Sequence, residues 1–64
     1  MRITLAAARV NAKMTQEEAA KSIGVTKYTI INWENGKTFP KADKIPIICA
    51  TYQREYDEIN WTGQ

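Results

Sequence analysis

The chain has 64 residues, of which nine are Lys or Arg and seven are Asp or Glu, and its formal net charge is +2. This length predicts one domain over residues 1–64, near the lower limit for folding without disulfides or metal. One cysteine excludes an internal disulfide, and with no histidine we expect no metal or other cofactor and a reducing, cytoplasmic location. No run of 18 apolar residues and no signal peptide is present, so we expect the chain to stay out of membranes.

Residues 3–12 (ITLAAARVNA) are rich in Ala and Leu and predict a first helix by propensity. Periodicity leaves the buried face of this helix open, because two apolar stripes compete: Leu5, Ala8 and Ala12, or Ile3, Ala7 and Val10.

A second helix is predicted to begin after Thr15. Glu18 follows Thr15 at the spacing of a capping box, in which each side chain binds the other residue's backbone N–H. Gly24 takes a positive φ at no steric cost, so we expect the helix to end near Ile23 with Gly24 in the left-handed region.

A third helix is predicted over residues 26–35, with Thr26 as its cap and with Ile30 and Trp33 turned inward. Residues 15–36 therefore read as two short helices joined by a tight turn. That arrangement is typical of the helix-turn-helix, whose second helix lies in the major groove of DNA.

The amino-acid sequence of these helices resembles that of a known protein family. The segments that carry the resemblance are Thr15-Gln16-Glu17-Glu18-Ala19-Ala20, Gly24-Val25-Thr26 and Trp33-Glu34-Asn35-Gly36-Lys37. Over residues 3–61 the chain resembles the phage lambda repressor and Cro-like regulators, also called the xenobiotic-response-element family. The resemblance implies an all-α, five-helix lambda-repressor-like domain whose first helix buries Leu5 and Ala8.

The resemblance also implies an ion pair between Arg9 and Glu34 that joins the first helix to the third, the alternative being two unrelated surface charges. Relatives carry glycine where this chain has Lys13, so the first helix is expected to end early or with Asn11 in the left-handed region. Relatives carry a larger apolar residue at Ala19, and we expect Trp33 or another core residue to fill that space.

Base contacts are expected from the outward side chains of the third helix: Lys27, Tyr28 and Asn32. Lys donates to guanine O6 or N7, Asn pairs with adenine, and Tyr offers a hydroxyl and a ring for the thymine methyl. The resemblance implies the same three positions. The alternative is a solvated polar face, and we assign no chemistry to the neighbouring Ile31.

Phosphate contacts are expected around this helix. The start of the second helix favours an anion through its free N–H groups and dipole, although a capped helix start is also ordinary structure. The candidates are Thr15, Gln16, Thr26, Thr29, Asn35, Lys37 and Lys41, with Lys44 weaker. Residues 1–44 carry a net charge of +4 and residues 45–64 of −2, which suits a basic DNA-facing front, although ordinary surface charge stays possible.

The C-terminal third predicts two more helices. Gly36 is expected in the left-handed region and residues 38–41 extended before Pro40. Asp43 is expected to cap a fourth helix, residues 44–51, with an inward stripe of Ile45, Ile48, Cys49 and Tyr52. Cys49 is interpreted as a small buried hydrophobe, because the chain has no histidine to activate it. A fifth helix over residues 55–60 is expected to present Tyr56 and Ile59 to the core.

These features predict a DNA-binding transcriptional regulator and not an enzyme. Its expected partner is a double-stranded DNA operator, and no small-molecule effector is expected. A Cro-type repressor that binds a palindromic operator as a homodimer fits best, in a bacterial or phage-infected cell. Candidate dimer contacts are Tyr52, Tyr56, Ile59 and Trp61, although Trp61 could equally fold back on its own domain. The alternative function is a protein-interaction module, such as an antitoxin.

Overall fold

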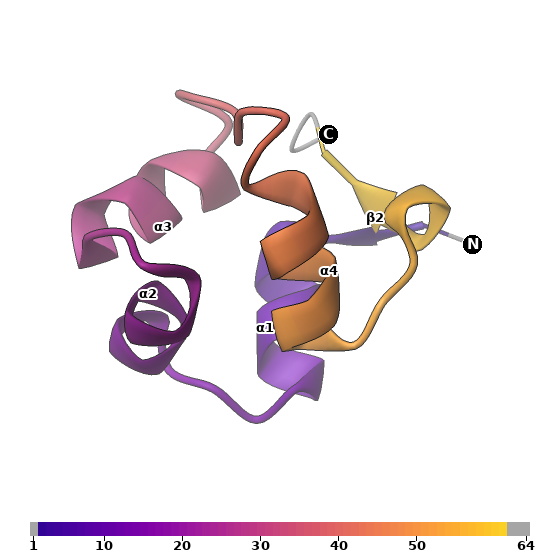
Figure 1. Ribbon diagram of the computed structural model, residues 1–64, viewed down its shortest axis with the longest axis horizontal. Coiled ribbons are helices and arrows are strands. Elements are labelled where there is room, and N and C mark those ends of the chain that lie inside the picture. The colour runs from indigo at the N-terminus through magenta and orange to yellow at the C-terminus, as the bar shows by residue number, and fades with distance from the viewer. Residues whose placement is uncertain (1, 62–64) are drawn as a thin grey trace.

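The computed structural model describes residues 2–61, and these form mostly helical structure (Figure 1). In chain order the described elements are β1 (Ile3–Thr4), α1 (Leu5–Asn11), α2 (Gln16–Ile23), α3 (Lys27–Glu34), α4 (Ile45–Tyr52), the 3-10 turn η1 (Tyr56–Glu58) and β2 (Ile59–Asn60). Figure 1 shows α2 and α3 on one side of the molecule and the two strands on the other, with α1 and α4 between them. The predicted all-α, five-helix fold is therefore correct for four helices and wrong for the fifth.

The two ends of the described chain pair with each other. Strands β1 and β2 run parallel, with Ile3 opposite Ile59 and Thr4 opposite Asn60. The predicted fifth helix is replaced by η1 and β2, because this pairing draws residues 59 and 60 into extended backbone.

The same pairing explains why α1 begins later than predicted. Thr4 is extended, and its hydroxyl accepts a hydrogen bond from the Ala7 N–H at 3.0 Å, so Thr4 caps a helix that starts at Leu5. Of the two competing apolar stripes of α1, the one that contains Leu5 and Ala8 is buried. At the other end, Lys13 takes a φ of +60°, so the left-handed residue is Lys13 and not Asn11.

The predicted boundaries of α2 and α3 are confirmed. Thr15 and Glu18 form the capping box, and Gly24 ends α2 in the left-handed region with a φ of +88°. The Thr26 hydroxyl accepts from the Thr29 N–H at 3.2 Å and so caps α3. Gly36, beyond α3, has the expected positive φ of +75°.

One apolar cluster joins all four helices and β2. Its members are Leu5, Ala8, Ala19, Ala20, Ile23, Ile30, Trp33, Ile48, Tyr52 and Ile59, all buried. Ala19 is fully buried in this cluster together with Trp33, so the small side chain at position 19 leaves no exposed gap. Burying these residues is the main stabilising contribution in so short a chain.

The fourth helix differs from its prediction at its start. Lys44 and not Asp43 occupies the N-cap, no side chain caps the helix, and Pro46 lies in the first turn as expected. Ile48 and Tyr52 are buried, but Cys49 is only half-buried. Burial nevertheless raises the pKa of the Cys49 thiol, which makes it less reactive.

Candidate nucleic-acid interface

Helix α3 presents a polar outer face while its inner face is anchored in the core. Ile30 and Trp33 are only 1% and 6% exposed, and both pack into the apolar cluster. Lys27 and Tyr28 are exposed and Asn32 is half-buried, so all three predicted base-contacting residues reach the surface of one helix. Tyr28, at 78% exposure, is the most exposed large apolar side chain among the described residues. A ring so exposed gains little from the core and is free to contact a ligand.

The three threonines predicted to contact phosphate already take part in hydrogen bonds within the protein. The hydroxyls of Thr26 and Thr29 lie 3.0 Å apart, and the Thr15 hydroxyl accepts from the Glu18 N–H at 3.1 Å. These side chains therefore cap or support the starts of α2 and α3. A phosphate bound there would contact the free backbone N–H groups of the first helical turn as well as the hydroxyls.

The loop after α3 carries the remaining predicted phosphate contacts. Asn35, Lys37 and Lys41 are exposed, whereas Lys44, the weaker candidate, is half-buried. The backbone of this loop stays close to α3, because the Lys37 N–H donates to the Asn32 carbonyl at 2.9 Å. The backbone of Lys37 is thus held at the end of α3, and Lys41 lines a shallow depression together with Thr29 and Trp33 of α3.

The ion pair expected between Arg9 and Glu34 is present and half-buried. Arg9 Nε donates to Glu34 Oε2 at 2.7 Å, and Arg9 Nη2 lies 3.4 Å from Glu34 Oε1. Arg9 Nη1 also donates to the Met14 carbonyl at 2.9 Å. The pair therefore ties α1, the α1–α2 link and the end of α3 into one geometry.

Gln16 joins this network, which sequence reasoning missed. Its Nε2 donates to Glu34 Oε1 at 3.1 Å, so the side chain predicted to contact phosphate is also tied to the end of α3. The amide nitrogen carries a second hydrogen, which leaves one donor for a ligand. The contact between Gln16 and Glu34 links the start of α2 to α3. The family resemblance, which placed Arg9 beside Glu34, was the one indication in the sequence that Glu34 lies in such a network.

This network shifts the pKa values of two side chains, Arg9 and Tyr52. The hydrogen bond that Arg9 donates to the Glu34 carboxylate raises the pKa of Arg9, which keeps the guanidinium charged. Burial, with the nearby Glu34 carboxylate, raises the pKa of Tyr52 to about 12. The Tyr52 phenol is thus held neutral beneath the ion pair.

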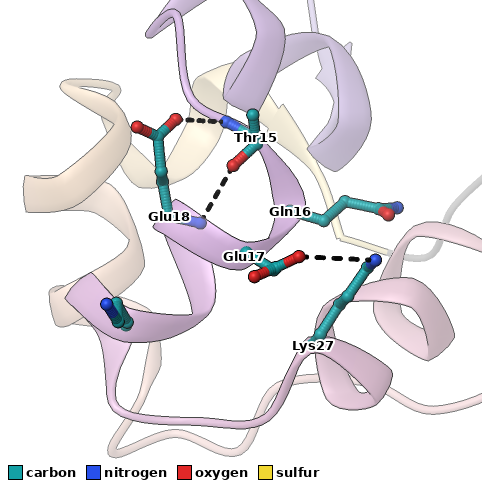
Figure 2. A pocket seen from close by; sticks show the side chains of 6 residues that line it. Thr15, Gln16, Glu17, Glu18 and Lys27 are labelled. Carbon is teal, nitrogen blue, oxygen red and sulfur yellow. Dashed lines mark hydrogen bonds and ion pairs between the residues drawn. The ribbon is translucent and has the colours of Figure 1, made fainter.

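The starts of α2 and α3 meet across an open depression of about 440 Å³, lined by Thr15, Gln16, Glu17, Glu18, Lys21 and Lys27. Figure 2 shows that Glu18 turns back to Thr15 while Glu17 faces Lys27. Lys27 Nζ lies 3.8 Å from Glu17 Oε1. Sequence reasoning did not predict this contact, because a contact between two helix starts depends on how the helices cross.

The candidate dimer residues fall into two groups. Tyr52 and Ile59 are 4% and 0% exposed inside this chain's own core, which corrects the expectation that their side chains are available to a second copy. Trp61 folds back on its own domain: its ring stacks on Tyr56 at 5.5 Å, and its Nε1 donates to the Tyr56 carbonyl at 2.8 Å. Tyr56 is 59% exposed, so its predicted place in the core is wrong.

Within residues 2–61, no three His, Cys, Asp or Glu side chains gather in a way that could hold a metal ion. No helix in that described part of the chain is long and apolar enough to cross a membrane.

Two helices crossing at a glycine turn, the second with a polar outer face, define a helix-turn-helix protein. Comparison with protein families agrees: the family model described as a helix-turn-helix domain matches residues 3–59, and the chain belongs to this family. No curated protein and no solved structure matches the chain. The family is one of DNA-binding domains and not of enzymes, so DNA is the partner that the fold implies.

Proposed function

We propose that this protein is a sequence-specific transcriptional regulator of the Cro or repressor type, which binds a partly palindromic operator as a homodimer. The observation that carries the proposal is the outer face of α3, where Lys27, Tyr28 and Asn32 reach the surface of a helix anchored by Ile30 and Trp33. In a helix-turn-helix this is the face that enters the major groove.

Each of the three side chains suits a different base edge. Lys27 donates to guanine O6 or N7, Asn32 pairs with adenine N6 and N7, and Tyr28 packs its ring on a thymine methyl group. The loop lysines Lys37 and Lys41, with Asn35 and the start of α2, contact the backbone and set the register of the helix on the duplex.

A homodimer follows from the size of the reading surface. One α3 helix spans too few base pairs to select a site in a genome, and two copies on a palindrome double the readout. The two recognition helices then enter successive major grooves about 34 Å apart. Bound dimers regulate by occupancy, because they block polymerase or a competing regulator.

The test is selection of bound sites from a randomised duplex pool at two salt concentrations. Enrichment of a motif with two-fold symmetry supports the proposal and supplies the operator. Enrichment of an asymmetric motif keeps sequence readout and refutes the dimer on a palindrome. Binding that falls steeply with salt and enriches nothing refutes sequence readout.

A second candidate function is a protein-interaction module, such as an antitoxin, on the same fold. The observation that favours it is the stacked pair of Tyr56 and Trp61, with Tyr56 59% exposed on the face that carries β2. An exposed aromatic ring with an ordered neighbour is a common anchor at protein interfaces. Loss of all duplex binding in the selection experiment would favour this function.

A further inference from the structure

Two neighbouring carboxylates in the first turn of α2 do different things. The Glu18 carboxylate accepts a hydrogen bond from the Thr15 N–H at 2.8 Å and completes the capping box. Glu17 takes no part in the cap, and its side chain faces the start of α3 instead (Figure 2). Helix capping therefore explains Glu18 but not Glu17, whose negative charge suits the positive end of α2 without requiring contact with α3.

Glu17 faces the side chain to which we assign a guanine contact. Its Oε1 lies 3.8 Å from Lys27 Nζ, and the two side chains are 77% and 50% exposed. An ion pair this exposed adds little to stability. A negative charge at the edge of a DNA-binding surface also weakens the attraction to phosphate. The charge of Glu17 therefore stabilises the start of α2 modestly and opposes phosphate, and what Glu17 can contribute to DNA recognition is its contact with Lys27.

An unrestrained lysine has two kinds of acceptor on DNA. Its flexible four-carbon stem carries a point charge that any phosphate attracts, whatever the sequence. A lysine that reaches a phosphate strengthens binding to every duplex alike, whereas a lysine held over the base edges strengthens binding only where guanine is present. The position of Nζ therefore decides whether Lys27 contributes to affinity or to discrimination.

We propose that Glu17 is a positioning residue that holds Lys27 over the base edges and away from phosphate. This inference rests on the proposed function. The ammonium group has three donors, so Lys27 donates to guanine while one donor stays with Glu17. The Glu17–Lys27 ion pair persists when the protein is bound to the operator. On other sequences it offsets the charge of Lys27 and so weakens the attraction of Lys27 to phosphate. Glu17 thereby raises the ratio of operator to non-specific affinity without touching a base.

The experiment compares Glu17→Gln with Glu18→Gln. Each substitution removes one negative charge from the same helix turn, and glutamine at position 18 keeps the capping box. Only the first change releases Lys27, so Glu18→Gln is the matched control for charge. Thermal unfolding of both variants, compared with the wild-type protein, verifies that each is folded.

Affinity is measured on the duplex enriched by selection and on a scrambled duplex of the same length and composition, across a salt series. For Glu17→Gln, the slope of log affinity against log salt on scrambled DNA steepens by up to about 0.9 per protomer, because the released lysine neutralises one more phosphate. Its ratio of operator to scrambled affinity falls several-fold. For Glu18→Gln both affinities rise together, and the slope and the ratio stay as in the wild-type protein.

A third variant separates positioning from simple repulsion. In a Lys27→Gln background, Glu17→Gln leaves the slope on scrambled DNA unchanged, because no lysine remains to be released. If Glu17→Gln and Glu18→Gln act alike, or if the slope steepens without Lys27, the inference is overturned while the proposed function stands. A wild-type protein with no preference for the enriched duplex overturns the proposed function, and the inference with it.

Discussion

The Arg9–Glu34 pair is predicted to be the most sensitive polar contact in the molecule. The two side chains are only 15% and 9% exposed, and their closest atoms lie 2.7 Å apart. Glu34→Leu leaves the Arg9 guanidinium in this largely buried site with the Met14 carbonyl as its hydrogen-bond acceptor. Removing one partner of a buried pair costs about 3 kcal/mol, because the other charge loses its compensation.

That cost is large for this chain. A domain of this length has a free energy of unfolding of about 3 to 10 kcal/mol. A loss of about 3 kcal/mol lowers the melting temperature by roughly 12 to 24 °C in a domain of this size. Glu34→Leu is therefore expected to melt well below the wild-type protein.

The assay is a double-mutant cycle of Arg9→Met, Glu34→Leu and the double variant, with unfolding followed by circular dichroism in heat and in urea. Because the double variant has no uncompensated charge, its loss is expected to be smaller than the sum of the single losses by about 2 kcal/mol. The exposed pair Glu17–Lys27 is the control, with a coupling of at most about 0.5 kcal/mol. Single losses below about 1 kcal/mol, or additive losses, would refute the reasoning.

Three further predictions concern other sites. The pKa of Tyr52 is about 12 in the folded protein and 10 unfolded, so its contribution is fully present below pH 10 and about 2 kcal/mol is lost by pH 12. Tyr52→Phe removes this loss, and urea unfolding across that range should show a flatter pH profile than the wild-type protein; equal profiles would contradict it. Lys13→Gly relieves a φ of +60° and is expected to raise the urea midpoint, with a gain of about 0.5 to 1 kcal/mol and an unchanged m-value; a lower midpoint would argue against strain there. Asn32→Ala is expected to cost about 1 to 3 kcal/mol at one operator position only, measured with single-base operator variants. A uniform loss across those variants would make Asn32 a backbone contact.

The helix boundaries that sequence reasoning predicted correctly depend on local chemistry. Thr15 with Glu18, Gly24 and Thr26 each act through contacts within about four residues, so their spacing alone carries the information. The same logic failed for Asp43, because its spacing to α4 allowed a cap that the chain does not form. Local signals show where a cap can form, and tertiary packing decides whether it does.

The functional surface could be predicted as a set of residues and not as a set of contacts. The inward spacing of Ile30 and Trp33 was enough to predict an outer face with Lys27, Tyr28 and Asn32. The contact of Lys27 with Glu17 could not be predicted, because it forms between two helices. The Arg9–Glu34 pair came from the family resemblance, since nothing in its spacing of 25 residues requires contact.

The sequence by itself determined the helix-turn-helix and the inward position of Ile30 and Trp33 on its second helix, because capping and periodicity act over a few residues. Only the tertiary structure decided the two ends of the described chain. Ile3 and Ile59 form strands because each supplies the other's backbone partner across the whole length of the domain. Because of that pairing, α1 begins only at Leu5, a strand takes the place of the end of the predicted fifth helix, and Ile59 is buried. No local sequence pattern at either end of the described chain predicts the pairing.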